Sequence, residues 1–219
     1  MAQITMTMIK ELRERTGAGV VDCKNVLAET GGDVDKAVEE LQKKGIAKAA
    51  KKQGRIAAEG LIGNYVHAGG RIAVLVEINC ETDFVARGED FGRLCEDVAM
   101  QIAAMSPLYV RPDDIPEADV EKQREIFAEQ VKAEGKPEKV VPRIVDGKLA
   151  KWKKESSLEE QAFVKDGDKS VGQLIAEFTA KTGEKTTIRR FVRYEVGEGL
   201  EKRESDIASE VAEMAGGKD

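Results

Sequence analysis

Ile72-Ala73-Val74-Leu75-Val76-Glu77-Ile78 is an apolar run rich in Val and Ile, and such a run predicts a buried strand. It leads into Cys80-Glu81-Thr82-Asp83-Phe84-Val85-Ala86-Arg87, which we expect to be exposed. A Thr-Asp-Phe-Val tip at the end of a strand presents a carboxylate beside an aromatic ring, and a rigid strand places such loop residues accurately. A plainer interpretation is that Thr82 and Asp83 cap a helix beginning near Glu89, with Phe84 folded into the core.

The segments around this strand predict an α+β core. Gly60 to His67 and Arg71 to Cys80 form two strands joined by a short loop, Ala68-Gly69-Gly70. The alternating segment Thr187 to Val196 is a third strand, which we place beside this hairpin. A helix over Glu89 to Met105 carries one apolar face that would cover the hairpin, made of Phe91, Leu94, Cys95, Val98 and Ile102. We therefore predict a small antiparallel three-stranded sheet with helices packed on one face.

Residues 1–45 predict a module of three short helices. Glycines at 17, 19, 31 and 32 separate the helices, Asp33 is a suitable N-cap for the third, and Gly45 is a suitable C-cap. A module this small is marginally stable alone, so we expect a mobile appendage with an exposed apolar patch. Residues 46–59 follow as a helical basic linker, a solvated tether containing Lys48, Lys51, Lys52 and Arg55.

The remaining core, residues 60–219, includes two charged helical arms. Glu117 to Gly135 and Pro137 to Glu155 predict an antiparallel helical hairpin over residues 117–155. Ser170 to Thr182 predicts another helix. The chain then ends in the strand already described and a helix over Glu204 to Met214, together residues 187–216.

Composition bounds the class of protein. The 219 residues are 41% hydrophobic, which is enough for a globular core. With 35 basic and 41 acidic residues the net charge is -6, which argues against general nucleic-acid binding. Cys23, Cys80 and Cys95 are odd in number and form no C-x-x-C pair, so we expect a reducing compartment. No apolar run has secretory or membrane-spanning length, so we expect a cytoplasmic protein that is neither secreted nor anchored.

Signals for catalysis or ligand binding are weak. His67 is the one histidine and has no candidate nucleophile near it in the sequence, which disfavours a hydrolytic triad. Gly17-Ala18-Gly19 lacks a preceding strand, and no P-loop motif occurs, so we expect no bound nucleotide. The cysteines lie on apolar stripes, where a thiol behaves as a small hydrophobe rather than a metal ligand. We therefore expect that the protein is not an enzyme and that it binds no cofactor and no metal ion.

Four separated motifs carry a resemblance to a known family. They are Leu12-Arg13-Glu14-Arg15-Thr16-Gly17-Ala18-Gly19, Thr82-Asp83-Phe84-Val85, Ser170-Val171-Gly172-Gln173-Leu174 and Val196-Gly197-Glu198-Gly199. In this order, over nearly the whole chain, they resemble bacterial elongation factor Ts. The resemblance implies guanine nucleotide exchange on the translation GTPase elongation factor Tu. It also implies that the N-terminal module is similar to a ubiquitin-associated domain.

The resemblance also implies which residues contact the partner. The tip residues Thr82, Asp83, Phe84 and Val85 would enter the GTPase domain. Phe84 would wedge between side chains near the magnesium site, Asp83 would add polar contacts, and neither would touch the nucleotide.

A second and a third contact are implied elsewhere in the chain. Lys10, Arg13, Val20 and Val21 would grip a helix of the GTPase domain. The alternative is a solvated first helix, with Val20 and Val21 in the small core. His67 matches a family position near another part of the partner. The open alternative is that His67 simply lies at the hairpin turn and contacts no partner.

The chain departs from the family pattern in three places. Many members have a longer core with two similar sheet subdomains, whereas this chain resembles a short form. A homodimer could supply the missing contacts in a 2:2 complex, with cysteines or strand edges at its interface. Val20-Val21 replaces a bulkier pair, and Ala162 stands where a proline is usual before Phe163.

Two other functions stay open at this point. One is a nonenzymatic adaptor that binds another protein through its N-terminal module and helical arms. The other is an RNA-binding factor that uses Lys48 to Arg55, which would show strongly salt-dependent affinity. The acidic balance disfavours the RNA-binding function, and no aromatic residues are interleaved with the basic ones.

Overall fold

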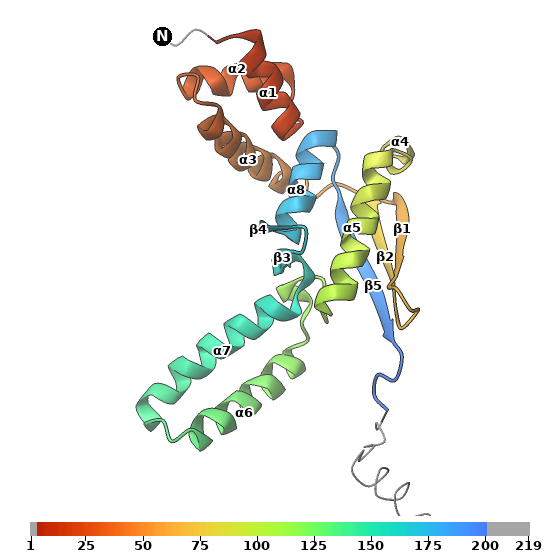
Figure 1. Cartoon of the computed structure of the whole chain (residues 1–219). Helices are drawn as coiled ribbons and strands as arrows, with labels where there is room; N and C mark the ends of the chain where they lie inside the picture. Colours follow the sequence, from red (N-terminus) through yellow and green to blue (C-terminus); the bar gives the residue numbers. More distant parts are fainter. Residues whose placement is uncertain (1–3, 201–219) are drawn as a thin grey trace, which may run out of the picture.

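The computed structural model describes residues 4–200 as three helices at the N-terminus, a small sheet with helices on one face, and a projecting pair of helices (Figure 1). The predicted α+β class is confirmed. The predicted helix over Glu204 to Met214 lies outside the described residues.

The sheet has three antiparallel strands, as predicted, and the third strand pairs with the second strand of the hairpin. Strands β1 (Glu59–Val66), β2 (Ile72–Cys80) and β5 (Thr187–Glu195) form an antiparallel sheet in the order β1-β2-β5. Gly69 and Gly70, with φ of 87° and 69°, supply the left-handed backbone of the tight β1–β2 turn. The central strand is covered on one face only, because Leu75 is 50% exposed. The predicted buried strand is thus buried on the face towards the helices, and its outer face is exposed at Leu75.

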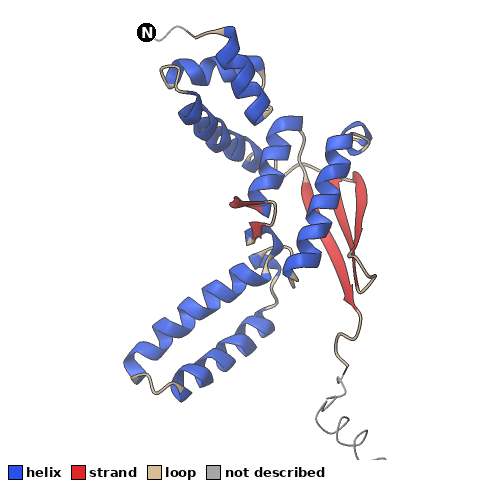
Figure 2. Ribbon diagram, in the orientation of Figure 1, coloured by secondary structure: helices blue, strands red, loops and turns tan. Residues whose placement is uncertain are grey.

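Helix α5 (Glu89–Met105) covers the inner face of the sheet, as predicted (Figure 2). The expected stripe of Phe91, Leu94, Cys95, Val98 and Ile102 is buried against Val74, Val76 and Ile78 of β2. The helix comes so close to β1 that a Cβ at Gly63 would lie 2.8 Å from the Cβ of Cys95. Helix α8 (Val171–Thr182) completes this core, where Phe178 meets Phe91 edge to face with ring centroids 5.8 Å apart.

Three helices form the N-terminal module: α1 (Met6–Thr16), α2 (Val20–Glu29) and α3 (Val34–Ala50). The glycine at 17 ends α1 with φ of 66°, and the Asp33 carboxylate caps α3 by accepting from the Lys36 N–H at 3.1 Å. The core of the module is small and contains Ile9, Leu12, Cys23, Val26, Leu27 and Ala37.

The prediction that Gly45 ends the third helix is wrong. Helix α3 continues to Ala50, and a Cβ at Gly45 would lie 3.2 Å from the Cβ of Ala180 on α8. The glycine permits close packing of two helices here, so its tendency to end a helix does not decide the local structure. The division into a module and a linker therefore has no helix end to mark it, and the proposed boundaries stay a prediction.

The basic segment after Gly45 is not a freely solvated tether. Lys48 pairs with Asp22 of α2 at 3.1 Å, Lys52 donates to the carbonyl of Gly183, and Arg55 pairs with Glu81 at 3.2 Å. Exposed side chains on this segment therefore hold three parts of the chain together. Because acidic partners occupy two of these charges, the observation weakens the RNA-binding alternative.

The predicted helical hairpin consists of α6 (Glu117–Ala133) and α7 (Val141–Ser156), and it projects from the core (Figure 1). Val131, Val141 and Val145 form its own small apolar core. Short 3-10 turns lie beside it: η1 (Pro112–Asp114), η2 (Glu138–Val140) and η3 (Leu158–Glu160). A second sheet of β3 (Ala162–Phe163) and β4 (Asp166–Ser170) was not predicted. Across residues 4–200, none of the helices is long and apolar enough to cross a membrane.

Candidate functional site

The Thr82-to-Val85 tip forms a separate short helix, α4 (Asp83–Ala86). Thr82 is its N-cap and accepts from the Val85 N–H at 3.4 Å, while Gly88 precedes α5. The interpretation that Thr82 caps the helix starting near Glu89 is therefore wrong. Phe84 is 85% exposed, so its predicted alternative place in the core is also wrong.

The tip is anchored from below. Ala86 and Cys80 are buried in the main core, and Val85 packs against that core. The expectation that the whole segment from Cys80 to Arg87 is exposed is wrong at these positions, because they anchor α4. Asp83 and Phe84 remain exposed.

The exposed face of the tip presents an apolar ring beside a paired carboxylate and guanidinium. Phe84 presents an apolar ring, and Asp83 presents a carboxylate that pairs with the Arg87 guanidinium at 3.0 Å. An open surface hollow lies beside them, lined in part by Val85, Phe91, Phe178 and Thr182. This arrangement suits insertion of a ring and formation of polar contacts in another macromolecule.

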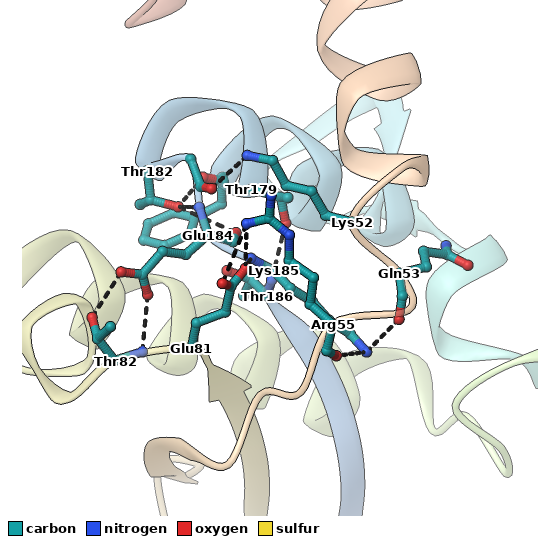
Figure 3. A network of polar contacts seen from close by, with 12 residues as sticks. Lys52, Gln53, Arg55, Glu81, Thr82, Thr179, Thr182, Glu184, Lys185 and Thr186 are labelled. Carbon is teal, nitrogen blue, oxygen red and sulfur yellow. Dashed lines mark hydrogen bonds and ion pairs between the residues drawn. The ribbon is translucent and has the colours of Figure 1, made fainter.

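A set of polar contacts holds the tip from the side of α8 (Figure 3). The Glu184 carboxylate accepts from the Thr82 N–H at 3.0 Å and from the Thr82 hydroxyl at 2.7 Å. The Glu81 carboxylate accepts from the Lys185 N–H at 2.6 Å. That hydrogen bond, together with the nearby Arg55 guanidinium, lowers the pKa of Glu81 from its usual value.

No signal in the sequence indicates these supporting residues. Glu184 lies 102 positions from Thr82, and no local motif or periodicity links the two. Only the pairing of β2 with β5, which brings the start of β5 beside the end of β2, places them together.

The expected contact residues of the N-terminal module are all on its surface. Lys10 and Arg13 are exposed on α1, and Lys10 lies 3.9 Å from Glu14. Val20 and Val21 are the first two residues of α2, and Val21 is 70% exposed. The alternative that places both valines in the small core is therefore wrong. Both valines are apolar side chains exposed at the start of α2.

Lys181 of α8 connects the module with the region of the tip. Its ammonium group pairs with Asp90, in the first turn of α5, at 2.7 Å. Its side chain also lies against Gly17, where an added Cβ would be 3.4 Å from the Lys181 Cδ. The α1–α2 turn and the start of α5 therefore approach the same helix, and both candidate contact regions lie near one end of α8 (Figure 1).

His67 lies away from this end. The register pairs Glu59 with Cys80 near the tip and Val66 with Ala73 near the hairpin turn. At about 3.3 Å per residue, His67 is roughly 25 Å along the sheet from the tip. Its Nδ1 lies 3.1 Å from the Tyr65 hydroxyl. The structure thus does not bring His67 together with Thr82 to Val85.

The cysteines do not form a metal centre. Cys23, Cys80 and Cys95 are free and buried, and burial raises the pKa of the Cys95 thiol to about 12. Among residues 4–200 there is no group of three or more His, Cys, Asp or Glu side chains placed to hold a metal ion. The thiols serve as small apolar groups in two cores.

Comparison with known proteins identifies the family. The sequence profile described as Elongation factor TS matches residues 3–198. The chain belongs to the elongation factor Ts family. Elongation factor Ts of Desulforamulus reducens is 60% identical over 212 residues, covering 97% of this chain and 98% of that protein. Elongation factor Ts of Syntrophomonas wolfei is 58% identical over 208 residues, covering 95% and 97%. For that of Myxococcus xanthus the identity is 55% over 216 residues, covering 99% of each.

Membership has two consequences for the predictions from sequence. It makes the chain a factor of translation elongation with nucleotide exchange function. These elongation factors Ts also have nearly the length of this chain, so the short form is shared with them.

Proposed function

We propose that this chain is a guanine nucleotide exchange factor for elongation factor Tu. It binds the GDP-bound GTPase, perturbs the Mg²⁺ and phosphate site through Thr82 to Val85, and promotes GDP release so that GTP can bind. The observation that carries the proposal is Phe84, 85% exposed on a capped and anchored helical turn. The factor shifts a binding equilibrium in the cytoplasm and makes no covalent bond, so it is not an enzyme in the chemical sense.

Differential binding supplies the mechanism. A protein that binds the nucleotide-free GTPase more tightly than the GDP-bound GTPase must weaken GDP binding in the same ratio. The Mg²⁺ of the GTPase neutralises phosphate charge, so its displacement weakens the hold on GDP. In this proposal the Phe84 ring enters the partner beside that ion. Asp83 then exchanges its exposed pairing with Arg87 for polar contacts that hold the displaced arrangement.

Burial of the Phe84 ring is not sufficient by itself. A thousandfold acceleration of GDP release requires a barrier about 4 kcal/mol lower. Full burial of one Phe side chain contributes roughly 1.5 to 3 kcal/mol. We therefore assign a second contact to the N-terminal module through Lys10, Arg13, Val20 and Val21. His67 contributes a third and weaker contact at the other end of the sheet.

The outer face of the sheet supports a homodimer in a 2:2 complex with elongation factor Tu. Its exposed apolar side chains lie on three adjacent strands, namely Ile62, Val66, Leu75, Val192 and Tyr194. The cysteines are buried, so this face and the strand edges are better candidates for the interface than a thiol. A strict monomer by light scattering at micromolar concentration, alone and with the partner, would remove the homodimer from the proposal.

Release of a fluorescent GDP analogue from elongation factor Tu, with Mg²⁺ present, tests the exchange function. Phe84→Ala should fold as the parent does, because the ring has few contacts to lose, and it should slow stimulated release roughly 10- to 100-fold. Asp83→Ala should also reduce the rate.

Ile56→Ala is a matched control, since this residue is 86% exposed outside the tip, and it should act like the parent. A folded parent that does not accelerate release would refute the exchange function and favour the adaptor alternative.

A further inference from the structure

The turn between α8 and β5 is fixed by its own hydrogen bonds. Gly183 has φ of 78° and donates its N–H to the Thr179 carbonyl at 3.0 Å, which ends α8. The Glu184 N–H is 3.3 Å from the Thr182 hydroxyl, and the Thr186 N–H donates to the Thr179 hydroxyl at 3.1 Å. These bonds fix the backbone from which the Glu184 side chain projects, and none of them involves the tip.

Glu184 then holds the first residue of the tip at two points. Both Thr82 donors, the N–H and the hydroxyl, reach the same carboxylate at 3.0 and 2.7 Å. Because the hydroxyl proton is directed at Glu184, the hydroxyl oxygen keeps a lone pair to accept the Val85 N–H of α4 at 3.4 Å. Hydrogen bonds to an ionised carboxylate are stronger than neutral ones. The cap of α4 is therefore oriented by a residue from another part of the chain.

The next residue makes the reciprocal contact. The Lys185 N–H donates to Glu81, immediately before Thr82, at 2.6 Å. The Lys185 ammonium group donates to the carbonyls of Gln53 and Arg55 at 2.6 and 2.9 Å. In Figure 3 the turn thus lies between the tip on one side and the chain leaving α3 on the other. The turn between α8 and β5 therefore binds both the tip and the segment that follows α3.

We propose that Gly183 to Lys185 form a positioning hub in which Glu184 holds the exchange tip in its inserting conformation before the partner arrives. A helix as short as α4 is not stable by itself, so its order must come from outside. Ordering the tip in advance removes that entropic cost from the encounter with the GTPase. Glu184 is thus a positioning residue that acts through Thr82. The role in exchange rests on the proposed function, whereas the hub itself does not.

Amide hydrogen exchange of the free protein tests the hub without the partner. Glu184→Ala should raise the exchange rate of the Thr82 and Val85 amides about tenfold, equivalent to about 1.4 kcal/mol. The amides in the centres of β2 and α5 should keep their rates. Glu160→Ala is the control, because this glutamate is exposed and has no ion pair within residues 4–200, and it should leave the tip unchanged. Unchanged protection of the tip in Glu184→Ala would overturn the proposal.

A double-mutant cycle asks whether Glu184 acts through Thr82. Thr82→Val removes the hydroxyl at nearly constant shape, whereas Thr82→Ser retains it. If Glu184 acts through Thr82, the double variant Thr82→Val, Glu184→Ala should show a smaller fold-increase in the Val85 amide exchange rate than the product of the fold-increases of the two single variants. Effects that simply multiply would show that the two residues act independently and would overturn the positioning role.

The GDP-release assay then connects the hub with function. Glu184→Ala should lower the maximal rate of stimulated release several-fold, with less effect on the concentration of factor that gives half the maximal rate, since the contact side chains remain. Glu184→Gln, which keeps one acceptor oxygen, should give an intermediate rate. A full maximal rate in Glu184→Ala, despite faster amide exchange at the tip, would refute the role in exchange. If the parent itself fails to release GDP, the proposed function fails while the amide data still decide on the hub.

Discussion

Gly63→Ala tests how closely α5 approaches the sheet. The added Cβ would lie 2.8 Å from the Cβ of Cys95 and 2.9 Å from its carbonyl oxygen. Two of the three nearest atoms are backbone and the third is a Cβ, so no flexible side chain can move aside and α5 must shift. Overpacking of a close-packed core costs about 1 to 3 kcal/mol. At about 2 to 4 °C per kcal/mol for a chain of this size, the melting temperature should fall by roughly 4 to 8 °C for a cost of 2 kcal/mol.

Thermal unfolding followed by circular dichroism measures this effect. Gly92→Ala is the matched control on α5, since an added Cβ there meets nothing within 4 Å. It should raise stability by about 0.5 to 1 kcal/mol, because alanine favours a helix over glycine. If Gly63→Ala were as stable as the parent, or moved in the same direction as Gly92→Ala, the close contact between α5 and β1 would be refuted.

Two further predictions concern ion pairs of the core. Arg111→Met should cost about 2 kcal/mol in denaturant unfolding, after allowance for partial exposure, because Glu159 loses two contacts of 3.0 Å and the Ile188 carbonyl loses a donor. Arg93→Met, which removes only a surface pair, should cost under about 0.5 kcal/mol, and equal costs would contradict this account. Hydrogen bonds from two arginines of β5 lower the pKa of Glu77 from 4.5 to about 2. Since the folded pKa is the lower one, its stabilisation is complete above pH 4.5 and is lost as the pH falls towards 2. Stability of the parent should thus fall more steeply over this range than that of Glu77→Gln, and identical slopes would refute the assignment.

The parts of the fold that were predicted correctly are those with local periodicity. The β1–β2 hairpin has apolar strands with two glycines at its turn, and the α5 stripe repeats at helical spacing, so both signals are contained in short windows. The residues predicted an exposed tip but left a buried Phe84 ring as an alternative, and the family resemblance favoured the exposed position.

The sequence misleads where contacts between residues far apart in the chain determine the local structure. Gly45 has the local signature of a helix end, but its contact with Ala180 lies more than 130 positions away and cannot be read from the sequence around it. The same holds for Glu184, whose partner Thr82 is 102 positions away. The β4 strand was missed for a different reason, since Asp166-Gly167-Asp168-Lys169-Ser170 is polar throughout and lacks any apolar alternation.

The burial of every cysteine makes the chain convenient for spectroscopic labelling. Cys23, Cys80 and Cys95 lie inside two cores, and burial raises the pKa of each thiol, so maleimide dyes should leave them unmodified in the folded protein. A new surface thiol, such as Lys24→Cys on α2 or Lys139→Cys at the end of the helical hairpin, would then be the reactive one. Dyes at both positions would report the distance between the N-terminal module and the helical hairpin during a cycle of nucleotide exchange, with the native cysteines left in place.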